Sequence, residues 1–434
     1  MAEELQLLIE KLVYGGDGLG HADGNTVFAP YVLPGEQVRA EIKTRKKKLI
    51  WAKPLEVLKA DAARVKPVCP HFGTCGGCHY QHAAYDAQVR FKVEILRETL
   101  SRMGGVSWTG AITEHTAEPL HYRNRAQWAV RNANPRALGY FLPESNAIVP
   151  IDRCDVLSPA LADTFARLQE LSRGGSLPEE ALEIEAFVDS ADSKVALNVA
   201  FKEFTRSASD LSKLFHDAVP ALSSLLLLDQ KKNRFELTSP GYLIQEAGGY
   251  QFRVSHLSFF QVNRFLVEEL LKTVLATAKG GLALDLYAGV GFFTLPLTRT
   301  FERVVSVDSN LSATRNLREN AETADRSIVS QHMQTEEYLK TATEAPDLVV
   351  LDPPRAGLGQ QSSQKLADLG PKEIVYLSCD PSTLARDLAI LQQTARKPAD
   401  AAPTAHRYEI QSVDFFDLFP QTFHIETLVR LRRV

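Results

Sequence analysis

The pattern of apolar and polar positions changes near residue 250. Beyond this point, short apolar runs typical of buried strands alternate with segments of helical period. Such alternation indicates a doubly wound α/β sheet, in which ligands bind beyond the carboxyl ends of the parallel strands. The predicted strands end in LALDLYAGVG, RVVSVDSN, PDLVVLDPP and KEIVYLSCDP. We therefore expect the chemistry of this part of the chain at those strand ends.

The N-terminal segment has a different pattern. Short β-type runs alternate there with Gly, Asp-Gly and Pro-Gly turn signals, which predicts a small β-barrel over residues 1–58. Its basic segment, KTRKKKLIWAK, contains Trp51 and no acid. Such a segment is either a solvated face or, on a small barrel, a surface that holds an RNA backbone and stacks bases.

Between these two parts the chain mixes strands and amphipathic helices. The stretch HYRNRAQWAVR places three arginines beside Tyr122 and Trp128, which fits a nucleic-acid face and an ordinary amphipathic strand equally well. We predict a central domain over 59–245 and a catalytic domain over 246–434. Segment 85–104 is predicted to form a helix, which could pack on the catalytic domain.

Composition narrows the class of protein. With 434 residues, 44% hydrophobic and 24% charged, the chain is long enough for two or three globular domains. A net charge of -4 gives no overall attraction to nucleic acid, so such contact must come from a local patch. The acidic start and the lack of a membrane-length apolar run predict a cytoplasmic protein without membrane contact.

The first strand end predicts a site for an adenosine ligand without a diphosphate. Asp285 closes the strand, and Gly289 and Gly291 would let the backbone approach a ligand. Thr294 stands where the dinucleotide-binding fingerprint has its third glycine. Asp308 ends the next strand, where it would accept hydrogen bonds from ribose hydroxyls. These features favour S-adenosylmethionine over NAD.

The third and fourth strand ends carry Asp352 and Cys379. Two prolines after Asp352 make a stiff loop, and Arg355 occupies a position that is aromatic in amino-methylating enzymes. A lone thiol such as Cys379 is often only a small buried apolar group. It could equally add to C6 of a pyrimidine and activate C5 for methylation, which also needs a base to remove the C5 proton. Glu426 is the candidate base.

These motifs, together with FFQVN at 259–263 and HIET near the end, closely resemble the RNA 5-methyluridine methyltransferases. The resemblance covers nearly the whole chain, and residues 9–42 resemble a TRAM domain, an OB-like RNA-binding module. It implies a Rossmann-like methyltransferase sheet, a TRAM-like barrel and a central α+β iron-sulfur domain. It also implies that Cys379 is the nucleophile and Glu426 the proton acceptor. The residues implied to bind S-adenosylmethionine are Gln261, Tyr287, Asp308 and Asp352.

Three positions depart from the family pattern. Ala288 stands where relatives often have Cys, and Phe292 where they have a small or amide residue. The bulk of Phe292 leads us to expect a disturbed cofactor contact. Asp380 replaces a common Asn, and its charge is expected to raise the pKa of the neighbouring Cys379 slightly.

The other four cysteines predict a metal centre. Their spacing suits tetrahedral zinc or an iron-sulfur cluster, and three nearby histidines leave a Cys-His zinc site open. The resemblance favours a 4Fe-4S cluster with a structural or RNA-positioning role. The predicted ligands are Cys69, Cys75, Cys78 and Cys154.

Several readings remain open. The expected substrate is a uridine of 23S rRNA; a tRNA 5-methyluridine methyltransferase and a catalytically silent RNA-binding iron-sulfur relative are the alternatives. A 5-methylcytosine enzyme typically uses a second cysteine in its catalytic domain, and Cys379 is the only one after Cys154. We expect a monomer without an obligate protein partner.

Overall fold

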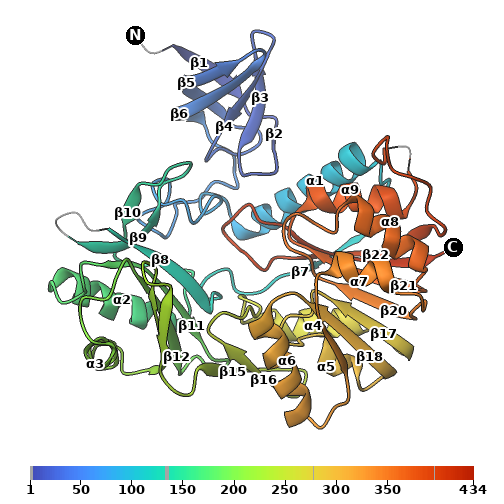
Figure 1. Cartoon of the computed structure of the whole chain (residues 1–434). Coiled ribbons are helices and arrows are strands. Elements are labelled where there is room, and N and C mark those ends of the chain that lie inside the picture. The colour runs from blue at the N-terminus through green and yellow to red at the C-terminus, as the bar shows by residue number, and fades with distance from the viewer. Residues whose placement is uncertain (1–2, 132–135, 277, 395) are drawn as a thin grey trace. The chain divides into compact units, whose positions relative to one another are not determined.

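The computed structural model describes residues 3–131, 136–276, 278–394 and 396–434 (Figure 1). The chain forms two compact units. Unit 1 comprises Met1–Glu98, Tyr140–Ile151 and Phe419–His424, and unit 2 comprises the remainder. Within the described residues, no helix is long and apolar enough to cross a membrane.

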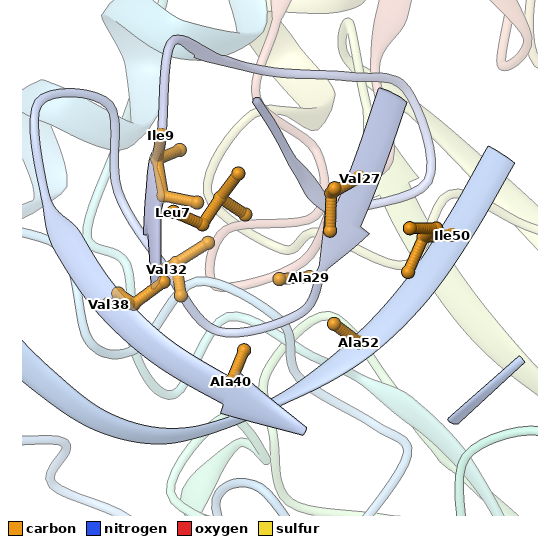
Figure 2. Close-up of a cluster of buried hydrophobic side chains, with 9 residues drawn as sticks. All are labelled: Leu7, Ile9, Val27, Ala29, Val32, Val38, Ala40, Ile50 and Ala52. Atoms are coloured by element: carbon orange, nitrogen blue, oxygen red, sulfur yellow. The ribbon is translucent and has the colours of Figure 1, made fainter. Parts of the chain in front are cut away.

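The N-terminal part of unit 1 is a six-stranded sheet of order β1-β5-β6-β4-β3-β2. Its apolar residues alternate inward and form one small core of Val, Ile, Leu and Ala, shown in Figure 2. The strands are β1 (Glu4–Leu8), β2 (Lys11–Leu12), β3 (Gly18–Ala22), β4 (Asn25–Ala29), β5 (Gln37–Lys46) and β6 (Leu49–Lys59).

Strand β3, which lies next to the edge strand β2, also approaches the opposite edge strand β1. A Cβ added to Gly20 of β3 would lie 2.2 Å from the carbonyl oxygen of Leu8 in β1, so only glycine fits there. The sheet therefore curls round its core as a small barrel does. Its basic segment spans the end of β5, the exposed turn at Lys47 and Lys48, and the start of β6. Trp51 stacks on Phe28 with ring centroids 5.8 Å apart. Its identification as a TRAM domain remains a prediction.

A seven-stranded sheet has the order β10-β9-β8-β11-β12-β13-β14, and a separate hairpin pairs β15 with β16. Helix α1 (Tyr85–Gly104) precedes these strands in the chain. The elements are β8 (Arg125–Arg131), β9 (Ala137–Phe141), β10 (Ile148–Pro150), α2 (Pro159–Arg173), β11 (Ala181–Val188), β12 (Val195–Phe201), α3 (Ala208–Ala218), β13 (Leu222–Asp229), β14 (Arg234–Leu237), β15 (Tyr242–Ala247) and β16 (Tyr250–Ser255).

The third large sheet has eight strands in the order β19-β18-β17-β20-β21-β23-β22-β7. The strands from β19 to β21 pair in parallel, whereas β23 is antiparallel to both neighbours. This arrangement confirms the predicted α/β class. The strands are β7 (Ile112–His115), β17 (Gly280–Leu286), β18 (Phe301–Asp308), β19 (Val329–His332), β20 (Leu348–Leu351), β21 (Glu373–Ser378), β22 (Tyr408–Phe416) and β23 (Glu426–Arg433).

Helices connect these strands and place the strand ends at one edge. They are α4 (Val267–Leu275), α5 (Thr294–Leu297), α6 (Leu311–Thr323), α7 (Thr335–Thr341), α8 (Gln360–Leu369) and α9 (Pro381–Leu391). Because β23 runs opposite to β21, Ser378 at the end of β21 pairs with Thr427 at the start of β23. The reversal therefore brings the beginning of β23 to the edge where the parallel strands end.

Candidate active site

The glycine turn after β17 leaves room for a ligand. Gly289 has φ +55°, and a Cβ added there would meet no atom within 4 Å. The Asp308 carboxylate at the end of β18 accepts hydrogen bonds from the backbone N–H groups of Gly289 (2.8 Å) and Asn310 (2.7 Å). Asp308 thus ties two strand ends together while staying partly exposed. Open space beside backbone N–H groups and a carboxylate fits the nucleoside part of S-adenosylmethionine.

Tyr287 begins this turn in a left-handed conformation, with φ +65°. Such a conformation is costly for a tyrosine and is kept where the surrounding structure requires it. Its hydroxyl hydrogen-bonds with Thr335 and Glu336, and burial raises its pKa to about 12. The hydroxyl is therefore neutral at physiological pH and holds α7 beside the turn.

Asp285 has a structural part in the turn. It is 1% exposed and accepts a 2.5 Å hydrogen bond from the Thr294 hydroxyl at the start of α5. Burial raises its pKa to about 7, and the nearby carboxylates of Asp308 and Asp352 contribute to this increase. Thr294 stands at the position of the third glycine of the dinucleotide-binding fingerprint. Its side chain thus binds a residue near the end of β17.

Asp352 and Gln261 meet although they lie far apart in sequence. The Gln261 amide hydrogen-bonds the Asp352 carboxylate and opposes the effect of burial, which raises the pKa of Asp352 to about 7. Gln261 is itself buried, and its backbone carbonyl accepts a 3.0 Å hydrogen bond from the Asn124 side chain. A residue ahead of β8 therefore holds the segment that carries Gln261.

Cys379 follows β21 directly and is partly buried. Burial raises the pKa of its thiol to about 12; Glu426 and Asp352 raise it as well, and Arg355 lowers it. Asp380, which was expected to raise the pKa of this thiol slightly, caps a helix. Its carboxylate caps α9 by accepting hydrogen bonds from the N–H groups of Ser382 (2.9 Å) and Thr383 (3.0 Å), so the carboxylates that act on the thiol are Glu426 and Asp352.

Glu426 is the first residue of β23 and is 5% exposed. Its pKa is raised well above the ordinary range by burial and by Asp352, and Arg355 opposes this effect. The predicted base is thus close enough to the predicted nucleophile to raise its pKa. In the ligand-free protein burial therefore disfavours the charged form of both groups.

Phe292, whose bulk is expected to disturb the cofactor contact, packs against other aromatic rings. Its ring is buried in an aromatic cluster, 5.3 Å from the Phe260 ring, 6.1 Å from Phe252 and 4.7 Å from Phe293. The larger side chain therefore fills the core behind the turn. Sequence reasoning missed this because two of the partner rings, Phe252 and Phe260, come from β16 and the segment after it.

The predicted metal ligands lie in both units: Cys69, Cys75 and Cys78 in unit 1 and Cys154 in unit 2. Cys69 raises the pKa of Cys75, whose own burial is the larger cause, so these two thiols lie near each other. No three His, Cys, Asp or Glu side chains of the described residues are arranged to hold a metal ion.

The parallel sheet, the glycine turn and the carboxylates at its strand ends define an α/β methyltransferase. Residues 84–434 match the tRNA (Uracil-5-)-methyltransferase family model. The chain therefore belongs to this family, and the prediction of an S-adenosylmethionine-dependent RNA (uracil-5-)-methyltransferase is confirmed.

Relatives of similar length support this assignment. The chain is 31% identical to the 23S rRNA (uracil(1939)-C(5))-methyltransferase RlmD of Alkalilimnicola ehrlichii, over 99% of this chain and 97% of that protein. It is also 31% identical to an uncharacterized RNA methyltransferase of Aquifex aeolicus, with 98% of each covered. A crystal structure of the Pyrococcus abyssi tRNA (uracil-54, C5)-methyltransferase in complex with S-adenosyl-L-homocysteine has a TM-score of 0.76 at 24% identity, over 98% of this chain and 100% of that one. This likeness confirms the fold.

Proposed function

We propose that the protein methylates C5 of a specific uridine in 23S rRNA through a covalent adduct with Cys379. The observation that carries this proposal is the convergence of Cys379 and Glu426, from two antiparallel strands, beside Asp352. The two halves of this reaction require a thiol and a carboxyl group in the same site. Gln261, Tyr287, Asp308 and Asp352 are the proposed contacts of S-adenosylmethionine.

The proposed reaction begins when the Cys379 thiolate adds to C6 of the uracil. A C–S bond forms, and the electron pair of the C5=C6 bond moves onto the C4 carbonyl oxygen. This electron pair returns to C5 and bonds to the methyl carbon of S-adenosylmethionine, whose sulfur–methyl bond breaks to leave S-adenosylhomocysteine. The Glu426 carboxylate removes the C5 proton, and the released electron pair restores C5=C6 and expels the thiolate.

Both groups must be deprotonated for their steps in the proposed reaction. Cys379 must lose its proton before it attacks, and Glu426 must be ionised before it accepts the C5 proton. Both pKa values are raised mainly by burial, which disfavours the charged forms. Methyl transfer is therefore expected to accelerate as pH rises above neutral, because the thiolate fraction increases.

The assignment to 23S rRNA is supported by relatives that match along nearly their whole length and carry that name, in Alkalilimnicola ehrlichii and Halomonas elongata. The alternative, a tRNA substrate, is favoured by the description of the family model. The decisive experiment maps 5-methyluridine by mass spectrometry in ribosomal and transfer RNA from cells with and without the gene. Loss of a 23S rRNA position supports the proposal, and loss of a tRNA position replaces it.

An assay with purified protein separates an enzyme from a catalytically silent RNA-binding relative. Radiolabelled S-adenosylmethionine is incubated with unmodified 23S rRNA fragments or tRNA transcripts. Transfer of label to uridine supports the proposed reaction, and cofactor binding without transfer to either RNA contradicts it. Cytoplasmic location and the monomeric state remain predictions from the sequence.

We also retain the 4Fe-4S cluster as a proposal, supported by the cysteine spacing and by the proximity of Cys69 and Cys75. Iron, acid-labile sulfide and zinc are measured in protein purified without oxygen. Iron and sulfide in equal amounts, lost in a Cys75→Ser variant, support the cluster. Stoichiometric zinc, or no metal at all, contradicts it.

A further inference from the structure

The loop that follows β20 is held against the first turns of α9. The Thr383 hydroxyl donates to the carbonyl oxygen of Arg355 (3.1 Å), and the Arg386 guanidinium donates to that of Ala356 (2.8 Å). The Asp387 carboxylate accepts a hydrogen bond from the Leu358 N–H (2.8 Å). Three successive attachments therefore fix the backbone of this loop along the helix.

The packing at Gly357 leaves the loop little freedom. Gly357 has φ +72°, and an added Cβ would lie 2.6 Å from Asp387 Oδ2 and 2.8 Å from Arg386 Nη2. Asp387 is fully buried and also accepts a 2.7 Å hydrogen bond from the Tyr376 hydroxyl of β21. The helix that begins directly after Cys379 thus determines where the backbone of Arg355 lies.

Three charged or ionisable groups act on Cys379. Glu426 comes from β23, Asp352 from the end of β20, and Arg355 from the clamped loop. Glu426 is likewise acted on by Asp352 and Arg355. Arg355 is the cation common to both sets, and it opposes the effect of burial on both groups.

We propose that Arg355 stabilises the charged forms of this site: the Cys379 thiolate before it attacks, and the Glu426 carboxylate before it accepts the C5 proton. This inference deepens the proposed function and rests on it. When the S–H bond of Cys379 breaks, the proton passes to solvent and the sulfur keeps the electron pair that later bonds to C6. The guanidinium keeps its protons throughout and acts only by its charge and hydrogen bonds.

This assignment explains why a cation occupies a position that is aromatic in amino-methylating enzymes. An amine nitrogen carries its own nucleophilic electron pair, whereas uracil C5 needs an anionic thiolate first. A positive charge close to a partly buried sulfur favours the thiolate over the thiol. A role limited to binding an RNA phosphate would leave the ionisation of Cys379 unchanged.

The test follows Cys379 ionisation directly, without relying on methyl transfer. The free full-length protein is alkylated with iodoacetamide across neutral to alkaline pH, and the Cys379 peptide is quantified by mass spectrometry. In Arg355→Gln the rate of alkylation at a given pH should fall, by about tenfold if the pKa of Cys379 rises by about one. Arg355→Lys should stay near wild type. Arg315→Gln, an exposed change on α6, is the matched control.

An unchanged alkylation profile in Arg355→Gln overturns the inference. Single-turnover methylation at saturating RNA gives the second readout: its pH profile should shift in the same direction as alkylation. A loss seen only as weaker RNA binding, with an unshifted profile, assigns Arg355 to the RNA backbone. If wild type alkylates as expected but transfers no methyl group to uridine, the proposed function fails while the charge assignment stands.

Discussion

The curled N-terminal sheet and the eight-stranded sheet differ in where their charged side chains lie. In the first, charged side chains lie at the surface, where Arg39 pairs with Glu4 and Glu56 across neighbouring strands. In the second, Asp285 and Glu426 are buried at strand ends. Exposed charges act as a group and are screened by salt, whereas a buried charge acts individually and shifts its neighbours' ionisation. We therefore expect single substitutions to have large effects in the eight-stranded sheet. In the N-terminal sheet we expect effects only from grouped substitutions.

The largest expected effect is that of Cys379→Ala. Methyl transfer should fall by at least roughly 10³-fold, because no other group can form the bond to C6. Equilibrium binding of S-adenosylmethionine should be nearly unchanged, since the glycine turn lies on other strands. Retained methylation, measured with labelled S-adenosylmethionine, would remove the thiol from the mechanism.

Glu426→Gln should slow turnover by roughly 10²–10⁴-fold, the range for loss of a general base. The RNA should then remain covalently attached, because release of Cys379 needs removal of the C5 proton. The adduct is detected as a slowly migrating band on a denaturing gel, and a double variant that also lacks the Cys379 thiol is the control. If the variant turns over slowly but forms no adduct, Glu426 acts before the Cys379 thiolate adds to C6.

Asp285 predicts a pH dependence of stability. Its pKa rises from 3.8 in the unfolded chain to about 7 in the fold, so the unfolded chain ionises first as pH increases. Its contribution to stability is full below about pH 4 and is lost as pH rises to about 7. Thermal unfolding of Asp285→Asn should depend less on pH over this range than that of wild type. The exposed control Asp325→Asn should follow wild type.

The smallest effect for each charge is expected in the N-terminal sheet. Replacing the exposed Lys46, Lys47 and Lys48 by Gln should weaken RNA binding. The slope of log affinity against log salt concentration should fall by the equivalent of up to about three phosphate contacts. Replacement of three exposed lysines elsewhere, Lys213, Lys231 and Lys232, is the matched control. Equal behaviour of the two triple variants in filter binding over a salt series would make the basic turn an ordinary solvated face.

Several parts of the site could be found in the sequence because they depend on neighbours along the chain. The strand endings at Asp285, Asp308 and Cys379 follow from apolar runs that stop at polar residues. The glycine turn follows from the need for positive φ angles at Gly289 and Gly291. Resemblance added Gln261 and Glu426, for which periodicity gave no specific signal.

Tertiary structure decided the rest. The strand β7 joins the catalytic sheet from more than a hundred residues upstream of β17, and the reversal of β23 brings Glu426 to Cys379. Asp380 caps a helix, and Phe292 packs in a core. Local sequence determined which chemical groups stand at the strand ends, because hydrogen bonding and side-chain periodicity act over a few residues. Their protonation states depend on burial and on charges from distant segments, and only the folded chain brings these together.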